Sequence, residues 1–417
     1  MSNRALRRRR SLAAPKQKNG RFCVPFGGRV MATAALRPSL VQDEASGQLM
    51  ALAAFAPYRL AMEECGSGLL DYAALHNAVT GRSSHTPRKP DHASVSLHGV
   101  LVVKPEHGGM GNVLRIIGQY ALLGVLLRRV VCLELDHQDP RFPSTDSMQA
   151  QIHPFAHSPV LDWRCLGVPT RSSTAHVIHV TKRNSSELLN YFGSIDVEKD
   201  LSAFELVRIH ADSTRVEPVL LSNPFLRAKQ LVPRGRSAGA CVRQLLLQPT
   251  KQTLDALSLY LNRLAFPRPY AAAHIRLGDS QMVGLGGAAD LRVRSSHHNK
   301  LFQCVLARLM GSSEHSNAST FFVATDNAEI VPELLQRSRM RAVFVPGTPV
   351  HTGAWAQTQL ARSHRINNVE GLQKVWLDHF LLSLGNGRLV SSGGRLSSFA
   401  EEAAARHTRF RGIIRCR

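Results

Sequence analysis

The sequence predicts an α/β fold with two Rossmann-like domains facing a cleft, preceded by a basic N-terminal extension. Residues 100–135 and 270–406 both alternate short β-branched runs with apolar helical segments. This alternation is typical of parallel sheets covered by helices, with sites at the carboxyl ends of the strands. The chain has 417 residues, of which 44% are hydrophobic, so two or three domains can each bury a core.

The first region is predicted to form a strand–loop–helix–strand unit. The apolar run 100–103 predicts a buried strand, and a glycine-rich loop follows over 105–112. Segment 113–129 is apolar nearly all round and predicts a buried helix, while 130–135 predicts the next strand. The unit therefore predicts a parallel pair of strands joined by a helix.

The second region repeats this pattern. Strands are predicted at 270–275, 320–324, 342–345 and 388–391, and helices at 298–310, 329–337, 369–384 and 397–406. The stretch between the two regions is less regular. It predicts strands at 175–180 and 206–209 and a helix at 254–264.

A proline-containing segment, 266–269, marks the expected boundary between the two domains. We expect a basic disordered tail at 1–42, a helical segment and linker at 43–94, and Rossmann-like domains at 95–267 and 268–417. The tail carries eight Arg and two Lys, and the first acid is Asp43.

The formal net charge of +22 is compatible with an anionic partner, either a nucleic acid or a small molecule such as a nucleotide sugar, but the excess of 42 Arg over 10 Lys is better explained by a compositional bias. The chain has no RNP-type motif, no zinc finger and no basic stripe interleaved with aromatics, so no nucleic acid is expected. No uninterrupted apolar run reaches about 18 residues, so no transmembrane segment is expected either.

Seven scattered cysteines lack CxxC pairs and zinc-type Cys/His spacing. This odd set predicts no disulfide framework and no structural zinc site, although one or two bridges stay open. Cys132 lies in an apolar run and is expected to be a small core residue.

The glycine loop is the first candidate site. Gly109, Gly111 and Asn112 lie between a predicted strand and a predicted helix. Glycines let a ligand approach the backbone, and a helix N-terminus offers free N–H groups to an anion. Neither a P-loop nor a full dinucleotide fingerprint is present. A tight strand–helix turn without a ligand is the alternative interpretation.

The second candidate is the segment His274-Ile275-Arg276-Leu277-Gly278-Asp279 at a strand end. Strand alternation places His274 and Arg276 on one side. A guanidinium there suits a diphosphate and would stabilise charge on a leaving nucleotide. A structural ion pair between Arg276 and Asp279 is the alternative.

Two further acids stand out. Asp326 follows a predicted strand and is either a ligand contact or a helix cap. Asp378 lies inside an apolar helix, so it needs a ligand or a structural arginine as partner.

Four blocks together resemble the GDP-fucose-dependent fucosyltransferases, the α-1,2, α-1,6 and protein O-fucosyltransferase group with a GT-B fold. These blocks are the loop at 108–112, the segment at 274–279, Phe322 to Asn327, and the stretch from Leu377 to Gly394. The resemblance covers residues 96–406, and the His-x-Arg-x-Gly-Asp block is its most specific part.

The resemblance implies inverting transfer of fucose from GDP-fucose to a glycan or protein hydroxyl, with no metal and no cofactor beyond the donor. Arg276 would contact the β-phosphate, and His274 the guanosine diphosphate. Asp326 and Asp378 would line the nucleotide pocket, and the loop Gly109–Asn112 would face the pyrophosphate or fucose. The domain 95–267 would serve the acceptor, and 268–417 the nucleotide sugar.

An acceptor hydroxyl needs a base, and Asp279, Glu106 and His107 are candidates without a ranking. Among the hydroxyls of the last block, Ser392, Ser397 and Ser398 are unranked donor contacts. Leu277 departs from the family, whose members often carry a second basic residue there. The resemblance implies the Golgi, but the sequence itself leaves the compartment unknown.

Two other functions stay open. The acids Glu134 and Asp136 are spaced like a metal site, which would suit another nucleotide-sugar glycosyltransferase. A non-catalytic protein that binds polyanions through its charge is the other reading, and salt-sensitive binding that survives Arg276→Ala would distinguish it.

Overall fold

The computed structural model describes part of the chain. The described residues are 65–80, 98–106, 109–135, 151–158, 161–165, 175–181, 183–227, 232–233, 237–266, 268, 270–276, 300–301, 303–309, 320–326, 341–347, 349, 368–385, 388–392, 397–406 and 412–416. All of them belong to one compact unit, Gln42–Arg417. The predicted tail at 1–42 and the helix at 329–337 lie outside the described residues, as does most of the predicted linker.

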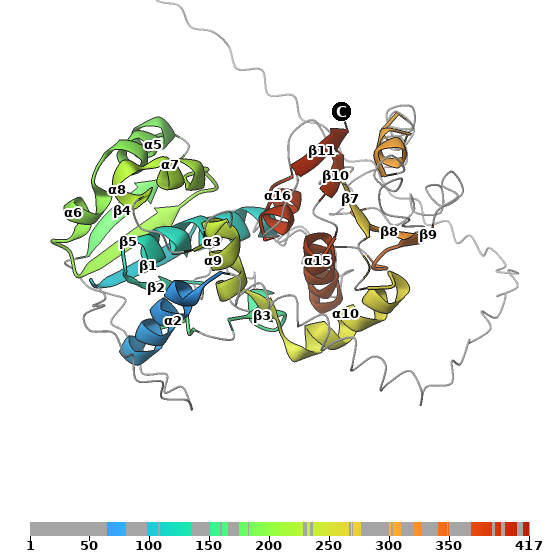
Figure 1. Ribbon diagram of the computed structural model, residues 1–417, viewed down its shortest axis with the longest axis horizontal. Coiled ribbons are helices and arrows are strands. Elements are labelled where there is room, and N and C mark those ends of the chain that lie inside the picture. The colour runs from blue at the N-terminus through green and yellow to red at the C-terminus, as the bar shows by residue number, and fades with distance from the viewer. Residues whose placement is uncertain are drawn as a thin grey trace, which may run out of the picture. The chain divides into compact units, whose positions relative to one another are not determined.

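The first sheet is parallel, with strand order β2-β1-β5-β4 (Figure 1). Its strands are β1 (Val100–Pro105), β2 (Val130–Leu133), β4 (His176–Val180) and β5 (Leu206–Ala211). The four strands predicted for this half of the chain are thus present. They are rich in β-branched residues, which fit a pleated surface buried on both faces.

Helix α3 (Met110–Leu126) packs on β1 and β2. It begins three residues before the predicted start, and 15 of its residues are buried. A Cβ on Gly124 would lie 2.2 Å from the Val131 side chain, so glycine is required where the helix crosses β2. The near-uniform apolarity of the helix therefore reflects burial on all sides.

Further helices belong to this half of the chain, and the last of them packs on α15 (Asn368–Ser383) rather than on the first sheet. They are α2 (Ser67–Thr80), α5 (Ser185–Ser194), α6 (Val197–Leu201), α7 (Glu217–Ser222), α8 (Pro224–Arg227), α9 (Ala238–Leu246) and α10 (Lys251–Arg263). A two-stranded antiparallel ladder joins β3 (Ala156–His157) to β6 (Gln248–Pro249). The hydroxyl of Thr250 accepts a hydrogen bond from the Thr253 amide and caps α10.

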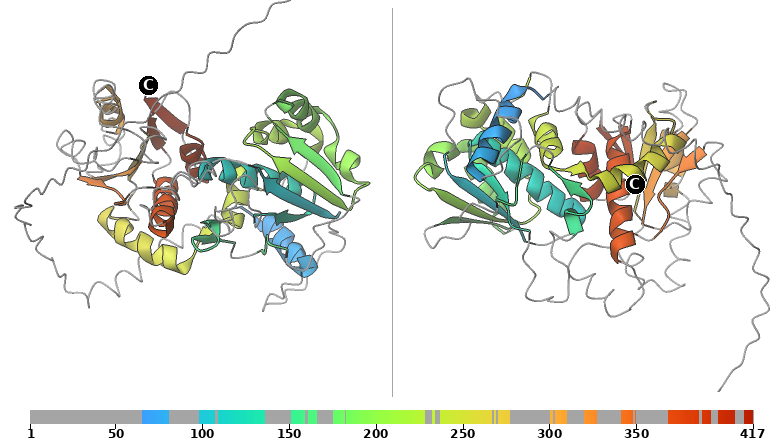
Figure 2. Two further views of the ribbon diagram at one scale, coloured as in Figure 1. Left: turned by 180° about the vertical axis from the view of Figure 1, so that it is seen from behind. Right: turned by 90° about the horizontal axis from the view of Figure 1, so that it is seen from below.

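The second sheet is also parallel, with order β11-β10-β7-β8-β9 (Figure 1). Figure 2 shows this half of the chain, coloured yellow to red, from two further sides. Its strands are β7 (Ala271–Ile275), β8 (Thr320–Thr325), β9 (Arg341–Val343), β10 (Arg388–Ser392) and β11 (Gly412–Cys416). Helices α15 (Asn368–Ser383) and α16 (Ser398–Ala405) accompany it. The sequence missed β11, which is an edge strand of mostly half-buried residues without clear alternation. The predicted α/β fold with parallel sheets is confirmed.

One large apolar core connects the two sheets. It contains Leu101 of β1, Phe322 of β8 and the aromatic pair Trp376 and Phe380 of α15. The Trp376 indole N–H donates to the Gln151 carbonyl at 2.9 Å, which ties α15 to the first half of the chain. Helices between the two sheets thus join them in one continuous core.

Three disulfides correct the expectation from the cysteine count. They are Cys65–Cys241, Cys132–Cys165 and Cys304–Cys416, with Cα–Cα distances of 5.6–5.7 Å. Cys132 is therefore bonded rather than a free core residue. The pairs are 33 to 176 residues apart in the sequence, so spacing alone carries no signal of them.

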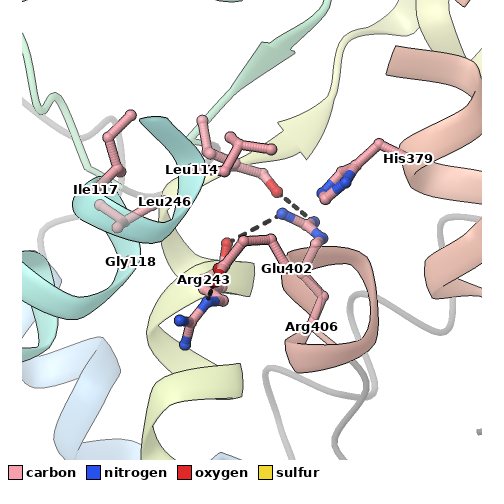
Figure 3. A pocket seen from close by; sticks show the side chains of 9 residues that line it. Leu114, Ile117, Gly118, Arg243, Leu246, His379, Glu402 and Arg406 are labelled. Carbon is pink, nitrogen blue, oxygen red and sulfur yellow. Dashed lines mark hydrogen bonds and ion pairs between the residues drawn. The ribbon is translucent and has the colours of Figure 1, made fainter. Parts of the chain in front are cut away.

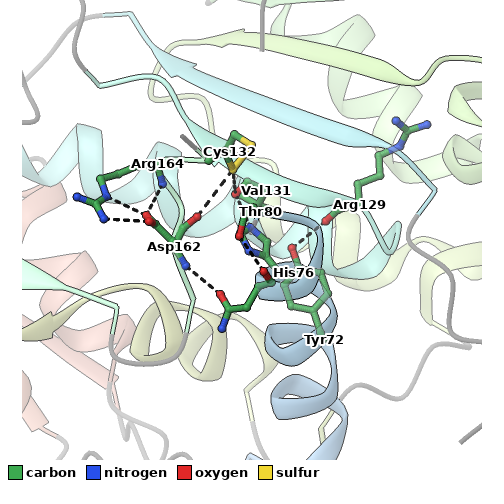
Figure 4. The surroundings of a disulfide bond; sticks show 10 residues. Tyr72, His76, Thr80, Arg129, Val131, Cys132, Asp162 and Arg164 are labelled. Atoms are coloured by element: carbon green, nitrogen blue, oxygen red, sulfur yellow. Dashed lines mark hydrogen bonds and ion pairs between the residues drawn. A yellow bond between two sulfur atoms is a disulfide. The ribbon is translucent and has the colours of Figure 1, made fainter. Parts of the chain in front are cut away.

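Helix α2 docks beside the Cys132–Cys165 bridge at the β2 edge of the sheet (Figure 4). The Tyr72 hydroxyl donates to the Arg129 carbonyl at 2.8 Å, and a ring nitrogen of His76 lies 2.9 Å from the Val131 carbonyl. Burial raises the pKa of Tyr72 and lowers that of His76, so both side chains stay neutral. The helix therefore covers the open edge of β2 through uncharged hydrogen bonds.

Candidate active site

The candidate site lies at the carboxyl ends of β7 and β10. These strands are neighbours, and His274 of β7 pairs with Ser391 of β10. The Arg276 amide donates to the Ser392 hydroxyl at 2.8 Å, so the end of β10 fixes the backbone of the motif arginine. Of the three unranked serines, Ser392 is thus the one bound to the motif.

His274 faces the interior between β7 and α16. Its ring centre lies 5.7 Å from that of Phe399, and the residue is buried. Burial, together with the cations Arg276 and Lys374, lowers the pKa of His274 to about 3. Its Nδ1 atom has no hydrogen-bond partner among the described residues. The imidazole is therefore neutral at physiological pH, with one ring nitrogen unpaired.

The N-termini of α3 and α16 meet beside this imidazole. A Cβ on Gly111 would lie 2.2 Å from the Phe399 backbone nitrogen and 2.6 Å from its Cα. Only glycine allows that contact, so the loop glycine has a structural reason in addition to any ligand. Gly109 caps α3 without a side-chain hydrogen bond, and Asn112 is half-buried in the first turn.

The first turn of α16 also has an unsatisfied cap. Ser397 is the N-cap residue, yet its side chain makes no cap hydrogen bond. Its hydroxyl oxygen is buried and has no partner among the described residues. Helix N-termini present free amides that favour negative charge. Two uncapped helix starts thus meet next to Arg276 and His274.

Asp378 has a cationic partner, but it is a lysine of its own helix rather than an arginine. Lys374 donates to Asp378 Oδ2 at 2.9 Å and to the Val345 carbonyl at 2.8 Å, and both side chains are buried. Burial raises the pKa of Asp378 to about 6, although Lys374 opposes the shift. Its Oδ1 atom is buried and has no hydrogen-bond partner among the described residues.

Asp326 directly follows β8, which pairs with β7 so that Thr325 lies opposite Ile275. The buried Asp326 therefore lies at the same carboxyl-terminal edge of the sheet as Arg276. Asp279 and His107 lie outside the described residues. Glu106 is described and half-buried, directly after β1.

The acids Glu134 and Asp136 were the alternative metal site. Arg208 forms an ion pair with the Glu134 carboxylate at 2.9 Å, and the Lys104 amine lies 3.9 Å from the same carboxylate. These two cations give Glu134 a structural role in the first sheet. Asp136 lies outside the described residues.

A buried ionic network joins α16 to α3 and α9. Arg243 pairs with Glu402 at 2.8 Å and with Glu217 at 2.7 Å, and Arg115 bonds Glu401. Burial alone would lower the pKa of Arg243, but the two carboxylates outweigh it and raise the pKa. Arg243 and Glu402 are 159 residues apart in sequence, so the pattern of the chain gave no sign of this pair.

A small pocket opens beside the network (Figure 3). Its lining comes from α3, α9, α15 and α16 and consists of Leu114, Ile117, Gly118, Arg243, Leu246, Leu247, His379, Glu402 and Arg406. Arg406 closes one side through a hydrogen bond to the Arg243 carbonyl at 3.3 Å and another to the Leu247 carbonyl. The polar groups that line the pocket are thus largely engaged in hydrogen bonds and ion pairs with other groups of the protein.

Comparisons with known proteins identify solved structures with a similar fold. No family model matches the sequence, and no curated protein does. Among solved structures, a mutant of Arabidopsis thaliana FUT1 in complex with GDP is similar at TM-score 0.51 and 14% identity, covering 84% of this chain and 78% of that one.

Two other solved structures are less similar. NodZ, an α-1,6-fucosyltransferase from Bradyrhizobium soaked with GDP-fucose, has TM-score 0.41 and 12% identity over 74% of this chain and 93% of its own. POFUT1 in complex with GDP-fucose has TM-score 0.39 and 12% identity over 78% and 99%. These two TM-scores support no further statement about this chain.

The FUT1 likeness confirms, at the level of the fold, the resemblance to GDP-fucose-dependent fucosyltransferases. The α/β fold with two parallel Rossmann-like sheets is consistent with the GT-B fold of those enzymes. The fold of this chain is thus similar to that of a solved fucosyltransferase. Among the described residues, no helix is both long and apolar enough to cross a membrane.

Sequence reasoning missed Lys374 and Phe399. The i,i+4 spacing of Lys374 and Asp378 on one helix was a readable signal for the first. Phe399 had none, because its role depends on the approach of two helices that are nearly 300 residues apart.

Proposed function

We propose that this protein is an inverting, metal-independent fucosyltransferase that transfers fucose from GDP-fucose to a hydroxyl of a glycan or protein. The observation that carries the proposal is the meeting of Arg276, Ser392 and His274 with two uncapped helix N-termini. This arrangement suits a nucleoside diphosphate, since it combines a permanent cation with free backbone amides.

Each group has a proposed task. Arg276 stabilises the negative charge that grows on the β-phosphate as the bond to fucose breaks. His274 stays neutral and offers a ring nitrogen to the nucleotide without adding charge. The loop Gly109–Asn112 faces the pyrophosphate or fucose through the amides of Gly109 and Gly111, since the Asn112 amide donates to the Gly109 carbonyl at 2.9 Å.

The nucleoside is expected near the two buried acids. Asp378 Oδ1 accepts hydrogen bonds from the guanine, whose N–H groups favour a carboxylate, and Asp326 lines the same pocket. The base that takes the acceptor proton is Asp279, Glu106 or His107. In this proposal residues 95–267 bind the acceptor and residues 268–417 the nucleotide sugar.

We place the protein in an oxidising compartment such as the Golgi. The three disulfides support this placement, because such bonds persist in secretory compartments and are rare in the reducing cytosol.

Calorimetric titration of the full chain with GDP, UDP and ADP, with and without EDTA, tests the proposal. We expect selective GDP binding that survives EDTA. Arg276→Ala should weaken it by about 10–100-fold, the worth of charge-assisted hydrogen bonds. Arg268→Ala is the matched control, because this exposed arginine lies shortly before β7.

A folded wild-type chain that does not bind GDP would contradict the proposal. Binding of UDP or ADP in its place would indicate a different nucleotide-sugar transferase, and an EDTA-sensitive titration would indicate a metal-dependent one. If GDP binds, release of free fucose or its transfer to candidate acceptors is measured next.

A further inference from the structure

The first sheet has one apolar face and one face that changes character along the strands. Leu101 and Val103 of β1 belong to the main core. On the other face, Val102, Val130 and Cys132 form a small apolar cluster near the strand starts. Because strand residues alternate, the polar residues that follow on this second face come together at the carboxyl ends.

Strand register places three metal-binding side chains on that polar face. His179 of β4 pairs with His210 of β5, and His210 pairs with Lys104 of β1. Glu106 lies two residues beyond Lys104 and therefore on the same face. Two histidines and one glutamate thus come from three adjacent strands.

The ligand atoms of these three residues are close. One atom from each of Glu106, His179 and His210 lies within 4.8 Å of the others. His210 Nδ1 is 3.8 Å from Glu106 Oε1, and the two imidazole centres are 4.8 Å apart. Ligands in a tetrahedral zinc site lie about 3.4 Å apart, given bonds of about 2.1 Å. Small side-chain rotations would close the set.

The backbones under these residues are held by sheet hydrogen bonds. The Glu106 amide donates to the Ala211 carbonyl at 2.9 Å, and the Asp212 amide donates to the Val180 carbonyl at 3.0 Å. Both bonds continue the strand pairing beyond the ends of the strands. The three side chains therefore rest on a rigid base, as a metal site requires.

The nearby charges are compatible with a cation. Lys104 and Arg208 share this face, and both face the Glu134 carboxylate. These two cations are therefore balanced by a carboxylate outside the group of three.

We propose that Glu106, His179 and His210 form a binding site for a divalent transition metal of the zinc class. Two imidazoles and one carboxylate suit such ions, and three protein ligands leave a position for water or another oxygen donor. The exposed His179 gives the ion a path from solvent. Among the residues that the structure describes, this is the group with a metal-type arrangement.

The site goes beyond the proposed sugar transfer and is not part of its chemistry. It also bears on the choice of base, because metal binding lowers the basicity of the Glu106 carboxylate and makes it a poorer acceptor for the proton of an acceptor hydroxyl. With the site occupied, Asp279 and His107 are the stronger candidates.

The test is zinc titration of the full chain, with its disulfides intact, against a chromophoric chelator. The wild type should bind one more zinc per chain than His210→Ala or His179→Ala, or bind it at least about tenfold more tightly. Cobalt absorption reports the geometry of the same site. His176→Ala is the matched control, because His176 lies on the opposite face of β4, where its ring stacks on Phe204.

Equal zinc stoichiometry and affinity in the wild type and His210→Ala would overturn the site. An equal loss in His176→Ala would do so too, since it would mean that zinc binds surface histidines at random. GDP titration of His210→Ala, which should match the wild type, confirms that the variant is folded. If the wild type binds zinc at this site but not GDP, the proposed transfer fails and the metal site stands.

Discussion

The buried imidazole of His274 makes stability depend on pH. Its folded pKa of about 3 lies below the ordinary 6.5, so the unfolded chain binds a proton that the folded chain does not. The stability is fully present above pH 6.5 and is lost as pH falls toward 3. Relative to His274→Asn, the wild type should lose about 1.4 kcal/mol per pH unit in that window. Urea unfolding at several pH values measures this difference.

The buried carboxyl group of Asp378 makes folding stability depend on pH in the opposite direction. Its folded pKa of about 6 lies above the ordinary 3.8, so the folded state holds the proton more tightly. Stability from this group is present below pH 3.8 and is lost as pH rises through 6. The difference between the wild type and Asp378→Asn should therefore slope the other way. If the difference in unfolding free energy from the wild type changed with pH in the same way for both variants, neither group would titrate as its burial predicts.

At the scale of an element, the junction of α3 and α16 depends on one missing side chain. Gly111→Ala would place a Cβ against the Phe399 backbone, which is not free to rotate away. We expect a loss of about 1–3 kcal/mol of unfolding free energy, the usual cost of overpacking. Thermal and urea denaturation measure it.

Gly193→Ala in α5 is the control for this substitution. A Cβ there would meet the Val219 side chain at an ordinary 3.5 Å, so alanine should be neutral or slightly stabilising. If Gly111→Ala unfolds like the wild type but loses GDP binding, the glycine serves the ligand alone. The structural role of the α3–α16 contact would then be wrong.

At the scale of the whole molecule, the buried ionic network fastens α16 to the first half of the chain. Glu402→Gln removes one carboxylate from Arg243 and Arg115, and Arg243 is almost fully buried. Leaving a buried charge undercompensated costs about 3–5 kcal/mol. Glu187→Gln, at an exposed position in the first turn of α5, should change stability by about 0.5 kcal/mol or less. Urea unfolding separates the two, and equal small effects would contradict a stabilising network.

The sequence predicted the alternation of strands and helices, because β-branched runs and all-round apolar helices carry a local signal. It also placed the motif residues at strand ends, and it predicted Asp378 to be an acid in need of a partner. It failed at the disulfides, the edge strand β11 and the Arg243–Glu402 pair.

Which distant groups meet depends on the packing of the whole fold. The contact of Gly111 with Phe399 joins segments that have no common sequence pattern, and so does the grouping of Glu106 with His179 and His210. The physical reason is that secondary structure follows from interactions within a few residues. A site built at the ends of parallel strands, by contrast, depends on sheet order and register, which long-range packing fixes.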